Sequence, residues 1–195
     1  MSLLWGIDFG KKFSGNTVIC YRNGSRVGFY QAEKNRDADR FILEKLEVQQ
    51  PGYIFIDAPL SLPGAFHDPA TYNDYFFRRC DQQLGAMSPM FLGGMTARAI
   101  RLKNQITARG IDLKETYPKA LASQLKLKKC GYRRGKENIG SCCDRIMESS
   151  NLVFDKKPIV SWHHLDALLA MISAIRYEQK LSLTFGDKSE GTIHI

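Results

Sequence analysis

Two apolar segments of the sequence each end in an aspartate, and this pattern constrains the fold more than any other feature. Residues 3–7 form a nearly unbroken apolar run that ends at Asp8, and residues 53–56 form a second run that ends at Asp57. Such runs are typical of strands that a sheet buries on both faces, with a polar group only at one end. The chemistry of this chain is therefore expected at the ends of these two strands.

The first fifty residues predict how these two strands are connected. Asn23-Gly24 is a tight-turn signal between two strand-like runs, so we expect the chain to begin with three antiparallel strands. Asp37 can cap a helix, and Pro51-Gly52 ends it. A right-handed crossover through this helix makes the strand that ends at Asp57 parallel to the strand that ends at Asp8.

The remaining segments complete an α/β pattern. Residues 60–110 are interpreted as a helical insertion, including a helix from Asp68 to about Leu84. Residues 111–116 predict another parallel strand, and a buried helix begins near His163. We expect one α/β domain over residues 1–195. Its mixed sheet has five strands, three antiparallel and then two parallel, flanked by helices, with a small hairpin at the end of the chain.

Composition favours a reduced, water-exposed environment and a polyanionic partner. Lys and Arg outnumber Asp and Glu by 28 to 20, which gives a formal charge of +8 and favours phosphate attraction. The five cysteines are widely spaced and include no Cys-x-x-Cys pair, which predicts reduced thiols. No apolar run has the length and flanks of a signal peptide or a membrane span, so we expect a cytoplasmic protein without a membrane partner. The oligomeric state is left open.

Two further acids join Asp8 and Asp57 as candidates for one site. Asp166 interrupts an otherwise apolar helix, where an unpaired charge costs several kcal/mol. Glu115 lies in the predicted third parallel strand, and the sequence leaves open which face of the sheet it occupies. Gathered carboxylates repel one another unless they share protons or a hard cation compensates them, and Mg²⁺ or Mn²⁺ prefers such oxygens.

Several short motifs carry a resemblance to a known superfamily. They are Gly6-Ile7-Asp8, Ile56-Asp57-Ala58-Pro59, Arg79-Cys80-Asp81, Glu115-Thr116-Tyr117-Pro118 and Leu165-Asp166-Ala167-Leu168. Their order over nearly the whole chain resembles the RNase H-like superfamily, and within it the predicted-nuclease family called domain of unknown function 429. The resemblance implies that the first and fourth strands are neighbours, so that Asp8 and Asp57 meet. It also implies a nuclease with Asp8, Asp57, Glu115 and Asp166 as catalytic residues and metal ligands.

Basic residues concentrate in the insertion and after Pro118, where they would flank such a site. Arg78 contributes to this positive charge. We interpret six of the other basic residues as nucleic-acid contacts: Arg79, Arg98, Arg101, Lys103, Arg133 and Arg134. The leading hypothesis is therefore a Mg²⁺- or Mn²⁺-dependent nuclease that acts on DNA or RNA.

Two other classes of function stay open at this point. Asp8-Phe9-Gly10, followed by Lys11 and Ser14, resembles the first phosphate hairpin of sugar kinases, Hsp70 and actin, which implies nucleotide binding or phosphoryl transfer. Those proteins use two such domains around the nucleotide, whereas this chain has the length of one. The other alternative is a non-catalytic nucleic-acid-binding module. His163 and His164 lie within one turn of Asp166, as packing residues or as a proton shuttle.

Overall fold

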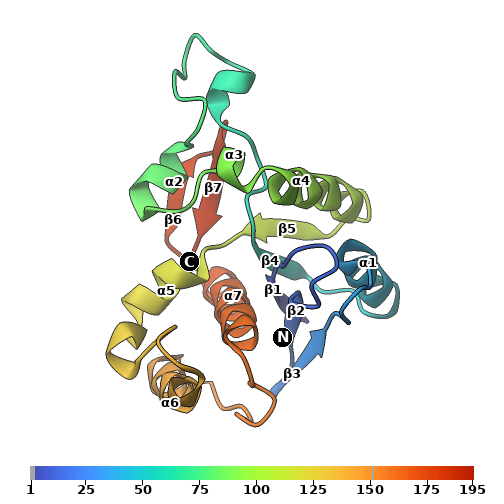
Figure 1. Cartoon of the computed structure of the whole chain (residues 1–195), viewed down its shortest axis with the longest axis vertical. Coiled ribbons are helices and arrows are strands. Elements are labelled where there is room, and N and C mark those ends of the chain that lie inside the picture. The colour runs from blue at the N-terminus through green and yellow to red at the C-terminus, as the bar shows by residue number, and fades with distance from the viewer. Residues whose placement is uncertain (1–2, 151) are drawn as a thin grey trace.

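The computed structural model describes residues 3–150 and 152–195 and contains a mixed sheet with helices on both faces (Figure 1). Among these residues the sheet has seven strands in the order β3-β2-β1-β4-β5-β7-β6. The strands are β1 Leu4–Asp8, β2 Val18–Asn23, β3 Arg26–Gln31, β4 Tyr53–Asp57, β5 Asp112–Glu115, β6 Thr184–Asp187 and β7 Gly191–His194.

The predicted α/β fold is confirmed, with the strand arrangement that the RNase H-like resemblance implied. β1 pairs antiparallel with β2 and parallel with β4, and β4 pairs parallel with β5. The expected number of five strands is too small, because the terminal hairpin joins the sheet. β7 lies parallel to β5 at the pair Glu115 and Ile193, and β6 follows antiparallel to β7. The hairpin thereby covers an edge of β5 that would otherwise leave unpaired backbone groups.

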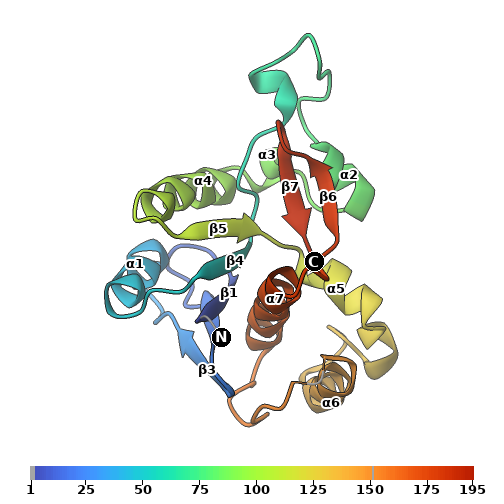
Figure 2. The same cartoon turned by 180° about the vertical axis from the view of Figure 1, so that it is seen from behind.

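The two faces of the sheet are covered by different helices (Figures 1 and 2). On one face, α1 Ala38–Val48 and α4 Gly94–Thr107 pack on Trp5, Ile7 and Ile56. On the other face lies the long helix α7 Trp162–Glu178, with α5 Pro118–Gln124 and α6 Ile139–Ser150 beside it. Because side chains alternate along a strand, Asp8 and Asp57 project toward α7.

Gly6 explains how closely α7 approaches the sheet. A Cβ atom at this position would lie 2.0 Å from the backbone nitrogen of Met171 and 2.4 Å from the carbonyl oxygen of Ala167. Only glycine allows the strand and the helix backbone to meet at this distance. This contact fixes the height of α7 above β1, and with it the position of Asp166 above the strand ends.

Residues 60–93, which we call the arm, lie between β4 and α4, and their early part around residues 64–66 projects from one end of the molecule (Figure 1). The arm contains the short helices η1 Gly64–Phe66, α2 Arg79–Leu84 and α3 Pro89–Leu92. The predicted helix from Asp68 to Leu84 is wrong over most of its length. Asp74 instead accepts hydrogen bonds from the backbone N–H groups of Phe76 and Phe77 at 2.7 and 2.9 Å, which is a turn that competes with helix formation.

Glu190, in the turn between β6 and β7, ties the hairpin to the arm. Its two carboxylate oxygens accept hydrogen bonds from the backbone N–H groups of Gly64 and Arg79, both at 2.8 Å. Glu190 is 3% exposed, so these bonds also satisfy a buried charge.

Composition predicted reduced thiols and the absence of a membrane span. All five cysteines are free thiols. Over residues 3–150 and 152–195, none of the helices combines the length and the apolar character that crossing a bilayer requires.

Candidate functional site

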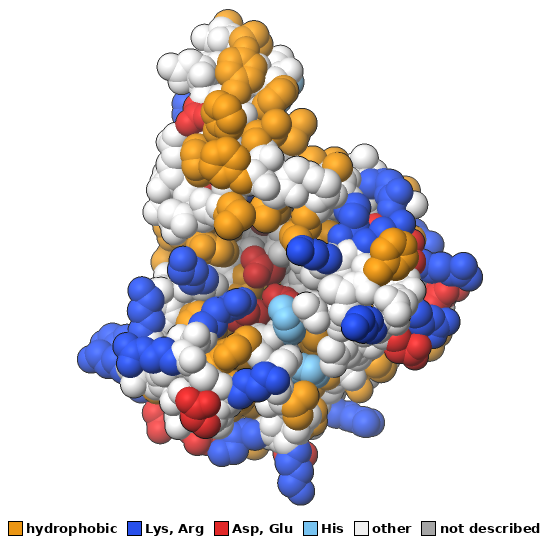
Figure 3. Space-filling view, in the orientation of Figure 1, with side chains coloured by type: hydrophobic (Ala, Val, Ile, Leu, Met, Phe, Trp, Pro, Cys, Tyr) orange, Lys and Arg blue, Asp and Glu red, His pale blue; other side chains and the backbone are white. Residues whose placement is uncertain are grey.

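Three of the four predicted acids come together where β1, β4 and α7 meet. Asp8 and Asp57 are paired in register as the last residues of β1 and β4. Asp166 lies in the second turn of α7, whose first turn is capped by the Ser161 hydroxyl. Figure 3 shows acidic side chains at the floor of a hollow, with a histidine beside them and Lys and Arg side chains around it.

Asp57 is the least compensated of the three carboxylates. Among the residues that the structure describes, no side chain or backbone group forms a hydrogen bond or an ion pair with it. Withdrawal of the carboxyl from solvent raises its pKa well above the ordinary value, and the neighbouring carboxylates Asp8 and Asp166 raise it further. Asp57 therefore retains all of its oxygen lone pairs for a ligand.

Asp8 is held by a histidine from α7. Its Oδ2 atom lies 2.8 Å from Nδ1 of His163, and Asp8 itself is 7% exposed. The hydrogen bond to Asp8 raises the pKa of His163, because the carboxylate favours the charged ring. The next residue, His164, points elsewhere: it hydrogen-bonds Ser161 and packs on Phe29. His163 thus belongs to the site and His164 to the surrounding packing.

Asp166 is fully buried and has two partners from the loop that follows α5. The Tyr132 hydroxyl donates to one carboxylate oxygen, and the Arg133 guanidinium donates to the other and forms an ion pair. Burial nevertheless raises the pKa of Asp166 to about 6, although Arg133 and Tyr132 both lower it. Desolvation therefore outweighs the two partners in the protein as it stands.

The structure does not bring Glu115 to the three aspartates. Glu115 pairs with Ile56 across β4 and β5, and residues in register project to the same face of a sheet. Ile56 faces α4, so the Glu115 side chain lies on the side opposite to Asp57. There its carboxylate accepts 2.7 Å hydrogen bonds at both oxygens from Arg78 and a 2.8 Å bond from the Leu60 N–H group.

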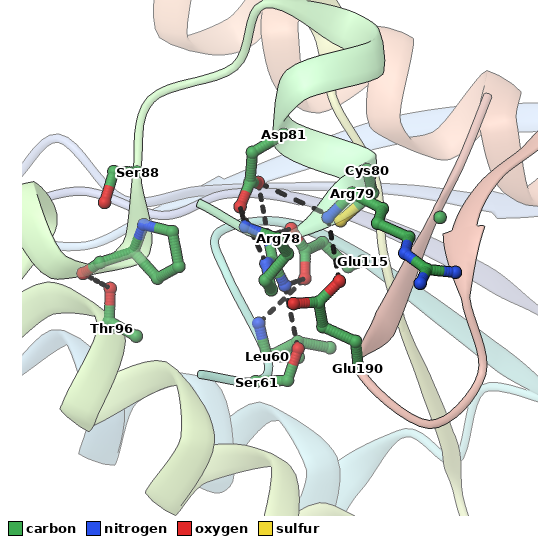
Figure 4. Close-up of polar contacts among 12 residues, drawn as sticks. Leu60, Ser61, Arg78, Arg79, Cys80, Asp81, Ser88, Thr96, Glu115 and Glu190 are labelled. Atoms are coloured by element: carbon green, nitrogen blue, oxygen red, sulfur yellow. Dashed lines mark hydrogen bonds and ion pairs between the residues drawn. The ribbon is translucent and has the colours of Figure 1, made fainter. Parts of the chain in front are cut away.

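Arg78 is the centre of this second cluster (Figure 4). Its side chain is 0% exposed and also donates to both oxygens of Asp81, at 2.7 and 2.9 Å, and to the hydroxyl of Ser61 at 2.9 Å. Burial raises the pKa of Glu115, whereas Arg78 lowers it. The prediction that Arg78 offers its charge to a polyanion is wrong, because no part of the guanidinium reaches solvent.

The predicted nucleic-acid contacts on α4 are engaged within the fold. Arg98 and Arg101 both pair with Asp39 at the start of α1, at 2.6 and 3.0 Å. The Arg98 side chain is 16% exposed, whereas Arg101 stays largely exposed. Lys103 donates to the carbonyl oxygen of Leu60 at 3.4 Å. Arg98 therefore holds α1 against α4, and Arg101 and Lys103 keep part of their charge toward solvent.

The other predicted contacts are more accessible. Arg79 is exposed and pairs with Asp187 at 3.2 Å. Arg133 has a half-exposed side chain although its guanidinium reaches Asp166. Arg134 is exposed and has no partner among the described residues. Arg133 places positive charge directly beside the aspartates, and Arg134 follows it in the same loop.

The three aspartates fit a hard divalent cation as a donor set, since all are carboxylates and Asp57 has no partner among the described residues. Their present arrangement is not a formed coordination site. Within the described ranges, no three His, Cys, Asp or Glu side chains are positioned to hold a metal ion. His163 holds Asp8, and Arg133 holds Asp166. An ion would take over the charge compensation that these two side chains now supply.

Tyr132 and His163 show what sequence reasoning could and could not find. His163 was considered as one of two neighbouring histidines, and helical spacing alone did not separate it from His164. Tyr132 had no detectable signal, because it reaches Asp166 from 34 residues away through a loop.

Comparisons with known proteins show similarity in structure but not in sequence. No protein-family profile matches the sequence, and no curated protein sequence is significantly similar to it. The structure is similar to the RuvC structure of Thermus thermophilus, with 13% sequence identity, a TM-score of 0.45, and coverage of 91% of this chain and 96% of that chain. Membership of the narrower predicted-nuclease family therefore stays a prediction.

Proposed function

We propose that this protein is a divalent-metal-dependent nuclease that hydrolyses phosphodiester bonds in nucleic acid. Asp8, Asp57 and Asp166 would hold Mg²⁺ or Mn²⁺. The observation that carries the proposal is the carboxylate of Asp57, which has no partner within residues 3–150 and 152–195 and lies beside two further carboxylates. Such a cluster is costly without a cation, and a bound cation stabilises it. When bound, the metal supplies an activated water and charge stabilisation for the leaving oxygen.

The remaining roles follow from the contacts of each side chain. His163 positions Asp8 through its Nδ1 atom and holds a proton there. Arg133 and Arg134 contact the phosphate backbone from the rim of the hollow. Glu115 is assigned a structural role with Arg78 rather than a metal-binding role. We further propose that residues 1–195 form one RNase H-like domain of the predicted-nuclease family, with residues 60–110 as its insertion.

The nucleotide-binding alternative has less support from the loop after β1. There the N–H group of Gly10 donates to the Thr17 hydroxyl at 3.0 Å, and the Ser14 hydroxyl donates to the Lys11 carbonyl at 2.9 Å. Both donors would have to be released before they could bind a phosphate. The three aspartates also offer acceptors, which repel a phosphate unless a cation lies between.

A nuclease assay tests the proposal. The wild type is incubated with single-stranded, duplex and branched DNA and RNA in the presence of Mg²⁺, Mn²⁺ or EDTA. We expect cleavage only with a divalent ion, and a loss of about 100-fold or more in Asp57→Asn. Asp144→Asn is the matched control, because Asp144 is an exposed aspartate on α6 that pairs with Lys156.

Thermal unfolding gives a readout that does not depend on activity. Mn²⁺ binding to the folded state alone must raise the unfolding midpoint, and we expect this rise in the wild type and in Asp144→Asn but not in Asp57→Asn. Cleavage that continues in EDTA, or an Asp57→Asn variant as active as the wild type, would contradict the proposal.

A further inference from the structure

A cavity of about 260 Å³ opens beside Asp57 on the arm side of the site. Its wall is mainly apolar and comes from three parts of the chain: Phe9 after β1, Met87 and Leu92 in the arm, and Met95 and Tyr117 at the starts of α4 and α5. The volume lies near the lower end of the ~300–1,000 Å³ range of small-molecule sites. The cavity therefore has room for one flat ring system.

The polar groups of the cavity select against anions. Asp57, Asp81 and Glu115 line it, and none of the described residues in its wall is a Lys, Arg or His. Asp81 and Glu115 are neutralised by the buried Arg78, so Asp57 is the lining carboxylate that would repel a phosphate without a compensating partner among the described residues. A neutral ring with N–H donors would instead find the free oxygens of Asp57 at its edge and apolar side chains on its faces.

Two of the lining residues are suited to a planar ligand. Tyr117 is half-buried, and its hydroxyl has no hydrogen-bond partner among the described residues. It lines the same cavity as Asp57. Met87 is 59% exposed at the mouth of the cavity, where a flexible thioether can adapt to an aromatic ring.

We propose that this cavity receives one nucleobase of the substrate strand, turned out of its stack beside the phosphodiester that lies over Asp8 and Asp57. The assignment rests on the proposed nuclease function and narrows it to strands with an unpaired or easily extruded nucleotide. Base and phosphate are then separated: the base enters the acid-lined apolar cavity, and the phosphates stay at the rim with Arg133 and Arg134. Enzymes that expose a base in this way read it by stacking and by hydrogen bonds to its edge.

Binding is tested with a variant that fills the cavity. Ala86 lines it, so Ala86→Trp occupies its volume, whereas Ala97→Trp adds the same side chain to an exposed position of α4 outside the cavity. Each full-length protein is titrated in Ca²⁺, a cation that carboxylate oxygens bind, with a short single-stranded DNA oligonucleotide and with a sugar–phosphate oligomer of the same length that lacks bases. The titrations are repeated with RNA.

We expect Ala86→Trp to weaken binding of the base-containing strand about tenfold, the size of one lost stacked base. It should bind the base-free oligomer as the wild type does, and Ala97→Trp should bind both normally. Equal binding of the base-containing strand by Ala86→Trp and the wild type overturns the inference. A loss that is the same for both oligomers also overturns it.

A second measurement on the wild type covers the case in which Ala86→Trp does not fold. A thiouracil-containing strand is cross-linked by light, and the modified residues are mapped by mass spectrometry. Cross-links to Met87, Met95 or Tyr117 support the base site, and cross-links confined to other surfaces overturn it.

The outcomes separate this inference from the proposed function. If the wild type cleaves nothing but Ala86→Trp still loses affinity only for the base-containing strand, the base site stands and the nuclease proposal fails. If Ala86→Trp cleaves and binds base-containing strands as the wild type does, the nuclease proposal stands and the base site fails.

Discussion

Replacing Arg78 by methionine tests the buried cluster beneath the arm. The Arg78 side chain donates five hydrogen bonds, two to Asp81, two to Glu115 and one to Ser61. Methionine keeps the aliphatic part of the arginine side chain but has no guanidinium and no charge, so it leaves two buried carboxylates without their cation. Removing one partner of a buried ion pair costs about 3–5 kcal/mol. For a chain of this length, that loss lowers the unfolding midpoint by about 6–20 °C.

The assay is urea and thermal unfolding, with Arg79→Met as the matched control. Arg79 is the next residue, but its side chain is 54% exposed and pairs with Asp187 at the surface. A surface pair of this kind contributes about 0–1 kcal/mol, so Arg79→Met should lie close to the wild type. An Arg78→Met variant within about 1 kcal/mol of the wild type would refute the argument that this cluster depends on its buried cation.

The same variant has a defined pH dependence. Burial raises the pKa of Glu115 and Arg78 lowers it, so the substitution raises that pKa further. An acid whose pKa is raised in the folded state takes up a proton on folding, and stability then increases as pH falls. The deficit of Arg78→Met should therefore shrink as pH falls toward the ordinary range of a glutamate, and grow again toward neutral pH.

Two further predictions concern packing and pH. Gly6→Ala should destabilise the protein by about 3 kcal/mol or prevent folding, because the added Cβ meets the backbone of Met171. Gly140→Ala in α6 is the control: its Cβ has free space, so urea unfolding should show a stability equal to the wild type or up to about 1 kcal/mol higher. Equal stability of the two variants would contradict the close approach of α7 and β1. Burial, and to a smaller extent Lys114, lower the pKa of His194 from its ordinary 6.5 to about 4. As pH falls, His194 is therefore protonated in the unfolded state before it is protonated in the folded state, and the free energy of unfolding should decrease from pH 6.5 to pH 4. His194→Gln should remove part of that slope, and an unchanged slope would show that His194 does not titrate differently in the folded state.

Strand ends were predictable from the sequence because they depend on local patterns. The apolar runs before Asp8 and Asp57, together with a crossover of fixed hand, were enough to predict parallel strands. Asp166 was identified because it is a single acid in an otherwise apolar helix. These three residues are the ones that the fold brings together.

The facing of Glu115 could not be predicted, because β5 has only four residues and moving its register by one residue reverses the faces of all of its side chains. The hairpin β6–β7 was expected, but its union with β5 depends on one register pair between distant segments. The same limit applies to Arg78. A buried arginine and an exposed one look alike in sequence, and only its three partners from separate segments distinguish it.

Glu190 has a consequence for how the arm unfolds. Its carboxylate joins segments that are 126 and 111 residues apart, so each bond closes a long loop and forms only when the β6–β7 hairpin is in place. Local structure secured by such contacts opens as one cooperative unit rather than residue by residue. The amide protons of Gly64 and Arg79 should therefore exchange with solvent at the same rate as those of the hairpin. The arm forms part of the wall of the cavity beside Asp57, so this wall should open only when the turn between β6 and β7 opens.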